Sequence, residues 1–438
     1  MSERGMFNGK LGFIIATSAS AVGLGNIWRF PTQAAGHGGG TFLLIYIAVV
    51  LIFGLSMLIT EISIGRATRK SPVKAYKELN PKYRIIGILG VVVPALILPY
   101  YCVIGGWLVG YQTGYLMDAD MADPGLFSDF AGSAEAVVAF LVFSAVVGMV
   151  VYFGVTKGIE KSSLVFMPIF ILLLIGLTIY GLLQPGSADG VEYYLSFDLS
   201  NLGADTFTAA LGQAFFSLSI AMGILITYGS YMSREENIER CSVAIITIDT
   251  LVAVLAGLLI IPMAYTHFGG DIEGGASLVF ITLPNIFADM PGGIIVANLF
   301  FVMLLFAAIT SAVSILEAVS STVIDNFGIS RHRAIVLVMI PALVAGTLIS
   351  LGFGPLSFIE IAGNGLLDIF DYVSNNLLMP IVAILTCIFV GHVLGTKFIE
   401  DEVERSGSFV TKRLYPIMIK WVCPILVAII FMSNFISF

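Results

Sequence analysis

Charged side chains are scarce in this chain of 438 residues. Asp, Glu, Lys and Arg make up 11% of it and hydrophobic residues 58%, and the mean hydropathy is +0.98. A soluble domain carries about 25% charged residues. The composition therefore excludes an ordinary soluble protein and indicates one that crosses a membrane many times. The net charge of −8 gives no support to a nucleic-acid partner.

The chain also lacks the residue patterns of enzymes and metalloproteins. Its four cysteines lie in or beside apolar runs, without the spacing of a metal site or a disulfide framework, and we expect them to be packing residues. Its four histidines are scattered at loops and helix ends. Walker, HExxH and CxxC motifs are missing. These absences argue against an enzyme, including one that acts within the membrane.

Long apolar runs dominate the sequence instead. A spanning helix needs about 20 apolar residues, and these runs are too long for barrel strands of about 10 residues. We predict an all-α polytopic membrane protein with eleven transmembrane helices. The predicted spans are 11–35, 41–65, 86–116, 134–155, 162–184, 207–232, 242–266, 291–324, 334–352, 369–394 and 414–436.

Lys and Arg are absent from every second loop. The loops 36–40, 117–133, 185–206, 267–290 and 353–368 carry none, whereas the alternate loops hold nearly all of them. The positive-inside rule then predicts a cytoplasmic N-terminal tail at 1–10. Eleven spans would leave the C-terminus outside.

The first span is interrupted at its middle by Gly23-Leu24-Gly25-Asn26. Glycine inside a helix costs about 1 kcal/mol relative to alanine. Backbone that leaves its helix within a bilayer must be buried in protein or line a wet cavity. We therefore expect a binding site at this break.

The sixth span is interrupted in a similar way, because hydroxyls and glycine enter its apolar run at 216–223. The two breaks occupy matching positions in two halves of five helices, which predicts an inverted repeat with broken helices 1 and 6. Such paired interruptions point to the substrate site of a secondary transporter; the alternative is that both are packing faces of small residues. The predicted organisation is a tail (1–10), a first repeat (11–184), an extracellular loop (185–206), a second repeat (207–394), and a cytoplasmic loop with helix 11 (395–438).

Polar groups inside the membrane are costly and are therefore candidates for function. Asn26 would coordinate a cation through its amide oxygen, or cap the helix that resumes at Ile27. Asp249 would protonate, pair or bind a cation, or only bond a neighbouring helix. Thr310 and Ser311 offer adjacent hydroxyls, which alternatively bond their own backbone four residues back.

Other charged residues suggest a gate or structural ion pairs. Arg29 lies one turn beyond the first break and would close an external gate with Asp371 or Asp368, which are one helical turn apart. Glu61 lies close before Arg66, so an ion pair at the inner face and a functional role both remain open. Glu317 is likewise open between a structural and a functional role.

Several motifs together resemble the neurotransmitter:sodium symporter family. They are 20–31 (SAVGLGNIWRFP), Gly38-Gly39-Gly40, Tyr100-Tyr101 before Trp107, 212–219 (GQAFFSLS) and Thr310-Ser311. The matches extend from residue 4 to about residue 394. The resemblance implies the leucine-transporter fold, and the count of eleven helices is similar to that of the bacterial tyrosine-transporter branch.

The resemblance implies two Na⁺ sites built from oxygen ligands, which suit a hard cation. The first would use Ala21, Asn26, Ser217, Asp249 and the carboxylate of the substrate. The second would use the carbonyls of Ala19, Val22 and Ala307 and the hydroxyls of Thr310 and Ser311. Many relatives have Asn where this chain has Asp249. Because a fixed carboxylate would supply the charge that chloride provides in animal members, we expect transport without chloride.

The resemblance also implies the substrate class. Monoamine carriers of the family have Asp at the position of Gly23, whereas glycine leaves room for an α-carboxylate at the positive end of a half-helix. Tyr101 would bind the same carboxylate, and the remaining pocket carries no charge. We expect a neutral, apolar or aromatic amino acid, bound by Ser20, Ala21, Gly23, Leu24, Gly25, Ile97, Tyr101, Phe216, Ser217, Ser219, Met222, Ser311, Ala312 and Ile315.

On the cytoplasmic side, Arg4, Asp325 and Tyr231 match the inner gate of the family, although Arg4 alternatively serves only the positive-inside rule. The sequence thus predicts a sodium-coupled symporter for hydrophobic or aromatic L-amino acids in a bacterial inner membrane. Its expected partners are a small-molecule substrate and the lipid bilayer, and its oligomeric state stays open. A sodium-dependent amino-acid sensor or a channel-like protein is the alternative.

Overall fold

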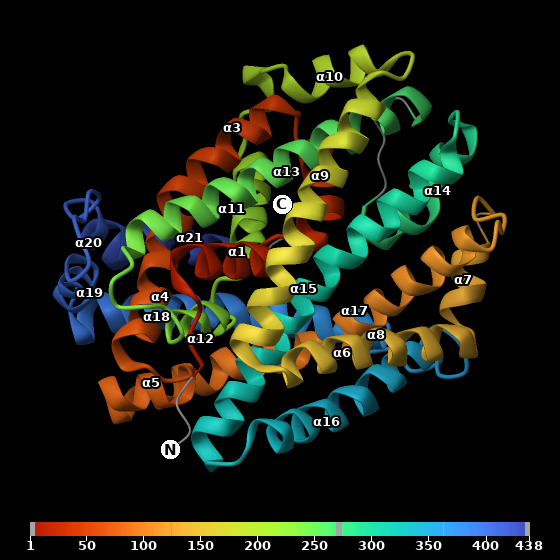
Figure 1. The fold of residues 1–438 in the computed structure, drawn as a ribbon. Helices are drawn as coiled ribbons and strands as arrows, with labels where there is room; N and C mark the ends of the chain where they lie inside the picture. Colours follow the sequence, from red (N-terminus) through yellow and green to blue (C-terminus); the bar gives the residue numbers. More distant parts are fainter. Residues whose placement is uncertain (1–4, 124, 269–273, 362, 434–438) are drawn as a thin grey trace.

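The computed structural model describes residues 5–123, 125–268, 274–361 and 363–433, and this part of the chain is folded almost wholly into helices (Figure 1). The first half contains α1 (Gly9–Ala21), η1 (Gly25–Arg29), α2 (Phe30–Gly36), α3 (Gly40–Val49), η2 (Val50–Gly54), α4 (Leu55–Thr68), α5 (Pro72–Leu79), η3 (Pro81–Tyr83), α6 (Arg84–Leu116), α7 (Leu126–Ala131), α8 (Ala134–Tyr152), η4 (Val155–Glu160) and α9 (Lys161–Leu182).

The rest of the chain is helical as well. Its elements are α10 (Ser187–Leu195), η5 (Leu199–Asn201), α11 (Ala204–Ser217), α12 (Ile224–Gly229), α13 (Ile238–Phe268), η6 (Leu278–Thr282), α14 (Leu283–Asp289), α15 (Gly293–Phe327), α16 (Arg331–Leu351), α17 (Leu366–Asp371), η7 (Tyr372–Leu378), α18 (Met379–Ile388), η8 (Phe389–Leu394), α19 (Thr396–Glu404), α20 (Tyr415–Ile417), η9 (Met418–Val422) and α21 (Cys423–Ser433).

The predicted spans are helical. Within the described residues, nine helices are long and apolar enough to cross a membrane, and α1 with η1–α2 forms a tenth span that is bent by 55°. The pair α11 and α12 occupies the predicted sixth span, with a longer interruption at 218–223.

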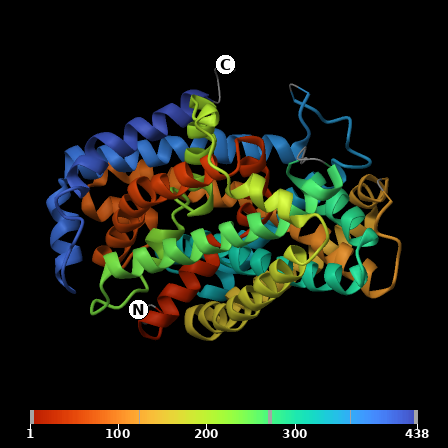
Figure 2. The same cartoon turned by 90° about the horizontal axis from the view of Figure 1, so that it is seen from above.

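Burial orders the spans from the centre of the bundle outwards. Of the most apolar window of Gly293–Phe327, 72% is buried, compared with 22% for Tyr415–Ser433. Accordingly, α15 packs against α1, α6 and α9, whereas α21 lies along one edge and packs against α18 (Figure 2). Both broken spans pack against continuous helices, because α1 contacts α9, α13 and α15 while α12 contacts α4 and α15.

Three of the predicted loops that lack basic residues contain helices, which the hydropathy pattern does not predict. They are α7, α10 and the pair η6–α14. The apolar stretch Leu278–Asp289 is too short to span a bilayer. It is helical because Phe280 stacks on Phe127, with ring centroids 5.1 Å apart, and meets Trp107 edge to face.

The basic loops gather at one end of the bundle. Arg66 lies beside Glu402, Arg69 donates to the Met232 carbonyl, and Arg331 donates to the Val151 carbonyl. We call this the basic end, and the opposite end, which carries α7, α10 and α14, the acidic end.

Candidate functional site

The first break is a short unwound segment between α1 and η1. The helix α1 ends at Ala21, and Val22 adopts an extended backbone with ψ of 106°. Helical structure resumes at Gly25 and continues into α2. Because no next turn of helix follows, the last carbonyls of α1 lack the partners that a continuing helix would supply and face neighbouring groups instead.

The second break is longer and holds strained backbone. The helix α11 ends at Ser217 and α12 begins at Ile224. Between them Ser219, Ala221 and Gly223 have φ values of 53°, 65° and 66°. Non-glycine residues persist in this region only where their surroundings hold them there, which is typical of binding sites.

The two breaks share one cavity of about 580 Å³. It contains every predicted substrate residue except Ala312, and it also contains Asn26 and the outer gate residues Arg29, Asp368 and Asp371. Ala312 is fully buried but does not line the cavity. Ser311 and Ile315 share the face of α15 that lines it, and Ala312 lies on a different face.

The cavity extends further towards the acidic end than the sequence predicted. The additional lining residues are Trp28, Thr32, Gln33, Tyr100, Ile104, Trp107, Phe127, Ile224, Gly274, Gly275, Ala276, Phe353, Leu367, Asn375 and Asn376. Asn375 follows Asp371 by one helical turn, so the spacing of these two residues is a signal that sequence reasoning missed. The contributions from the loops at 274–276 and 353 carry no such signal.

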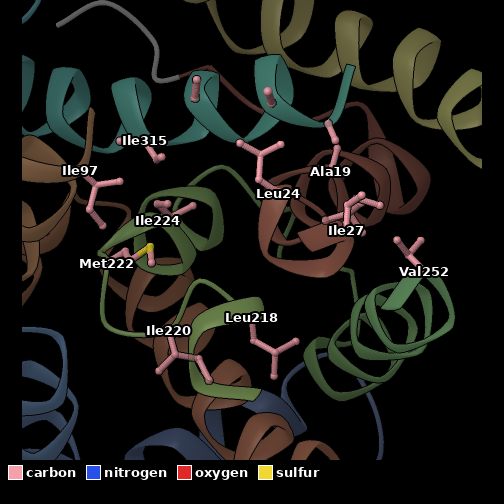
Figure 3. Close-up of a cluster of buried hydrophobic side chains, with 14 of the residues drawn as sticks. Ala19, Leu24, Ile27, Ile97, Leu218, Ile220, Met222, Ile224, Val252 and Ile315 are labelled. Atoms are coloured by element: carbon pink, nitrogen blue, oxygen red, sulfur yellow. The ribbon is translucent and has the colours of Figure 1, made fainter. Parts of the chain in front are cut away.

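One side of the cavity is wholly apolar. Ile97 of α6, Met222 of the second break, Ile224 of α12 and Ile315 of α15 lie close to one another around it (Figure 3). Methionine is unbranched and adapts to ligands of different shape. This wall would accept an apolar or aromatic side chain.

The other side of the cavity is polar and closely fitted around Gly23. A Cβ atom at this position would lie 2.8 Å from Ser311 Oγ and 3.2 Å from the Tyr101 hydroxyl. A Cβ atom at Gly25 would lie 2.8 Å from the Phe216 ring. The Tyr101 hydroxyl is buried and makes no hydrogen bond, so it is available to a ligand.

The residues of the first predicted Na⁺ site come together beside the first break. Asn26 Nδ2 donates to Asp249 Oδ1 at 2.9 Å and to Ser217 Oγ at 3.1 Å. Ser217 Oγ donates to the Asp249 carboxylate at 2.9 and 3.0 Å. Asn26 Oδ1 accepts from the Gly23 N–H at 3.1 Å, so the amide bridges the break and makes no cap on the next helix. The oxygens gathered here are of the kind that Na⁺ binds.

The second predicted site is assembled between α1 and α15. Ser311 Oγ donates to the carbonyls of Ser20 and Val22, each at 3.2 Å. Thr310 Oγ1 instead donates to the carbonyls of Phe306 and Ala307 in its own helix, at 3.0 and 3.1 Å. Ser311 thus joins two segments far apart in sequence, while Thr310 follows the alternative of bonding its own backbone.

The outer gate residues face one cavity without forming an ion pair in the described structure. The Arg29 guanidinium lies over the Phe216 ring, 4.9 Å from its centroid. Asp371 Oδ1 accepts from Asn375 Nδ2 at 2.7 Å, and Asn375 also donates to the Tyr100 hydroxyl at 3.1 Å. Arg29 and Asp371 therefore each have a different partner while lining the same cavity.

The residues predicted for the inner gate lie at the basic end. The predicted partner Arg4 lies outside the described residues, and Asp325 accepts from the Ser71 N–H at 2.7 Å. The Tyr231 hydroxyl donates to Glu317 Oε1 at 2.6 Å, and the Phe7 N–H donates to the Tyr231 carbonyl at 3.2 Å.

Glu61 and Glu317, whose roles the sequence leaves open, have different partners in the structure. Glu317 forms an ion pair with Arg331. Glu61 does not pair with Arg66, because Arg66 is buried and bonded to Glu402, with Nε 2.8 Å from Oε1. Instead, Glu61 accepts from the Ala221 N–H in the second break, at 2.8 Å. Of the two alternatives left open for Glu61, the ion pair with Arg66 is therefore not formed.

Comparison with known proteins places this architecture among transporters. The family model "Sodium:neurotransmitter symporter family" matches residues 4–119 and 127–438. An uncharacterized sodium-dependent transporter of Bacillus subtilis, YhdH, is 33% identical over 97% of this chain and 96% of its own. An uncharacterized sodium-dependent transporter of Haemophilus influenzae is 31% identical over 99% of this chain and 98% of its own.

A solved structure gives the same result for the fold. The crystal structure of MhsT in complex with L-phenylalanine is 34% identical and has a TM-score of 0.89, covering 98% of this chain and 99% of that one. The predicted leucine-transporter fold is thereby confirmed, and a role as an enzyme is excluded. The chain belongs to the sodium:neurotransmitter symporter family.

Proposed function

We propose that this protein carries hydrophobic or aromatic L-amino acids into the cell together with Na⁺, by alternating access. The observation that carries the proposal is the single cavity between the two helix breaks, with oxygen ligands on one side and an apolar wall on the other. MhsT was crystallised with L-phenylalanine, which agrees with this substrate class. The proposed setting is a bacterial inner membrane with the basic end in the cytoplasm.

In this proposal the substrate carboxylate lies at the first break. Gly23 and Gly25 keep the backbone open to it, and the Tyr101 hydroxyl donates a hydrogen bond. The carbonyls at the ends of α1 and α11, which no further turn of helix covers, receive the ammonium group. The side chain extends towards Ile97 and Met222.

Sodium binding is coupled to substrate binding through shared charge. A Na⁺ ion held by Asn26, Ser217 and Asp249 next to the carboxylate would neutralise part of its charge in a medium of low dielectric constant. A second Na⁺ between α1 and α15 would hold these helices together at Ser311. Closure of Arg29 onto Asp371 would then cover the cavity on the outer side.

Transport by the purified protein in liposomes tests this proposal. We expect saturable uptake of an aromatic amino acid that requires an inward Na⁺ gradient. Uptake without Na⁺ would contradict the proposal. Sodium-dependent binding without uptake would support a sensor, and non-saturable flux would support a channel.

Replacing Tyr101 with Phe is expected to weaken substrate binding. A hydrogen bond to a charged group contributes about 1.5–3 kcal/mol, and about 1.4 kcal/mol corresponds to a tenfold change in the dissociation constant. The dissociation constant should therefore rise by about tenfold or more in a calorimetric titration at saturating Na⁺.

The matched control is Tyr115→Phe. Its hydroxyl is also buried without a partner on α6, but Tyr115 does not line the cavity. An unchanged dissociation constant in Tyr101→Phe, or an equal rise in both variants, would argue against the proposed contact.

A further inference from the structure

Glu61 is a buried carboxyl group that takes no part in the proposed binding of substrate or sodium. Its side chain is 1% exposed in the middle of α4. Oε1 accepts from the Ala221 N–H at 2.8 Å, whereas Oε2 is buried and has no hydrogen-bond partner. One carboxyl oxygen is thus satisfied and the other is not.

No cation compensates a negative charge at this place. Among the described residues Glu61 forms no ion pair, and Arg66, close to it on α4, is held by Glu402. The titratable groups that face Glu61 are Tyr76 of α5 and Cys387 of α18. Both are neutral, and the Tyr76 hydroxyl is 2.8 Å from Thr386 Oγ1.

The other buried titratable groups on elements packed against α4 are bonded elsewhere. Tyr228 of α12 is hydrogen-bonded to Ser314, and Tyr415 of α20 to Thr60. On α13, Asp249 accepts from Asn26 and Ser217, and Glu239 accepts from Val410 and Thr411. Cys241, also on α13, is buried next to Arg66. None of them supplies a positive charge to Glu61.

An ionised carboxylate in this position would lack most of its solvation. Burying an unpaired charge in a medium of low dielectric constant is strongly unfavourable, and the usual response of the group is to become neutral. A proton on Oε2 removes the charge and leaves Oε1 as a carbonyl oxygen that accepts from Ala221. The neutral O–H group finds no acceptor among the described residues, but an unpaired neutral group costs less than an unpaired charge.

We propose that Glu61 is a proton-binding site that holds the second break in the arrangement seen here. The proton resides on Oε2 while Oε1 fixes the Ala221 N–H. Ionisation breaks the Oε2–H bond and transfers the proton to water as hydronium, and it requires water to reach this buried place. Ala221 has a positive φ of 65° next to Met222 of the cavity wall, so the state of Glu61 bears on the shape of the substrate pocket.

Infrared spectroscopy of the full-length purified protein tests protonation directly. We expect the wild type at neutral pH to show a carboxylic-acid C=O band that shifts in deuterated water. The part of this band that comes from Glu61 should be lost in Glu61→Gln. It should be retained in Glu135→Gln, which removes an exposed carboxylate. Glu61→Asp keeps an acid and should move the band without removing it.

Several outcomes would overturn the inference. If the wild type shows no carboxylic-acid band, the inference is wrong. It is also wrong if the band keeps its full intensity in Glu61→Gln, or if Glu135→Gln loses it to the same extent. If Glu61→Gln does not fold, an unmoved band in Glu61→Asp has the same meaning.

The consequence for transport rests on the proposed function and has its own readout. Glutamine keeps an oxygen acceptor for Ala221 but cannot titrate, so the pH dependence of sodium-driven uptake should be flatter in Glu61→Gln than in the wild type. Equal pH profiles would remove Glu61 from control of transport. If neither protein takes up amino acids, the proposed function fails, while the infrared band still decides whether Glu61 binds a proton.

Discussion

Replacing Gly23 with Asp is expected to abolish amino-acid binding. The first added atom would already lie 2.8 Å from Ser311 Oγ and 3.2 Å from the Tyr101 hydroxyl, before the carboxylate itself is accommodated. The new negative charge would then occupy the place proposed for the substrate carboxylate. Two like charges about 4 Å apart repel by about 4 kcal/mol near a protein surface, which corresponds to a loss of affinity of roughly a thousandfold.

Two further variants separate charge from crowding. Gly23→Ala adds only the Cβ atom and should weaken binding less than Gly23→Asp. Gly36→Asp adds the same charge at an exposed position of α2 where a Cβ atom meets nothing within 4 Å, and it should bind as the wild type does. Wild-type affinity in Gly23→Asp, measured by calorimetry, would refute the position proposed for the carboxylate.

Replacing Asp249 with Asn is expected to weaken sodium coupling and to introduce a requirement for chloride. Asp249 is fully buried and is held by Asn26 and Ser217, so its negative charge lies inside the proposed Na⁺ site. Loss of this charge should lower the apparent affinity for Na⁺ by about tenfold or more, equivalent to about 1.4 kcal/mol. The substituted amide is neutral, so an external anion would have to replace the missing charge.

Uptake at varied Na⁺ with chloride or gluconate as the anion measures both effects. In the wild type, exchange of the anion should leave uptake unchanged, because Asp249 supplies the charge. Asp205→Asn, an exposed acid at the start of α11, is the matched control and should behave as the wild type. Strong stimulation of the wild type by chloride, or unaltered ion dependence in Asp249→Asn, would contradict the role assigned to Asp249.

Local features of the sequence were sufficient for much of the fold. Apolar runs predict the spans because the bilayer requires a continuous apolar stretch from each helix. The glycines at 23 and 25 predict the first break because the penalty for unwinding is lowest there. The family motifs then predict which residues of the two breaks share a cavity, and all of those proposed for the substrate except Ala312 line it.

The partners of buried charged groups could not be predicted from local features of the sequence. The short spacing between Glu61 and Arg66 allows an ion pair, yet Arg66 reaches Glu402 on α19 and Glu61 reaches Ala221 in the second break. The helix η6–α14 was likewise missed, because aromatic partners on distant segments stabilise it.

The sequence alone therefore determined the membrane class, the helical spans and the positions of the two breaks, because these depend on local hydropathy and backbone propensity. Only the tertiary structure decided which groups meet across the bundle. The packing of helices far apart in the chain brings Asn26 to Asp249 and Ser311 to Val22. The same packing gives Glu61 one oxygen with a hydrogen bond and one without a partner. The physical reason is that a buried polar group is satisfied by whichever partner packing brings within hydrogen-bond distance, and sequence spacing does not specify that partner.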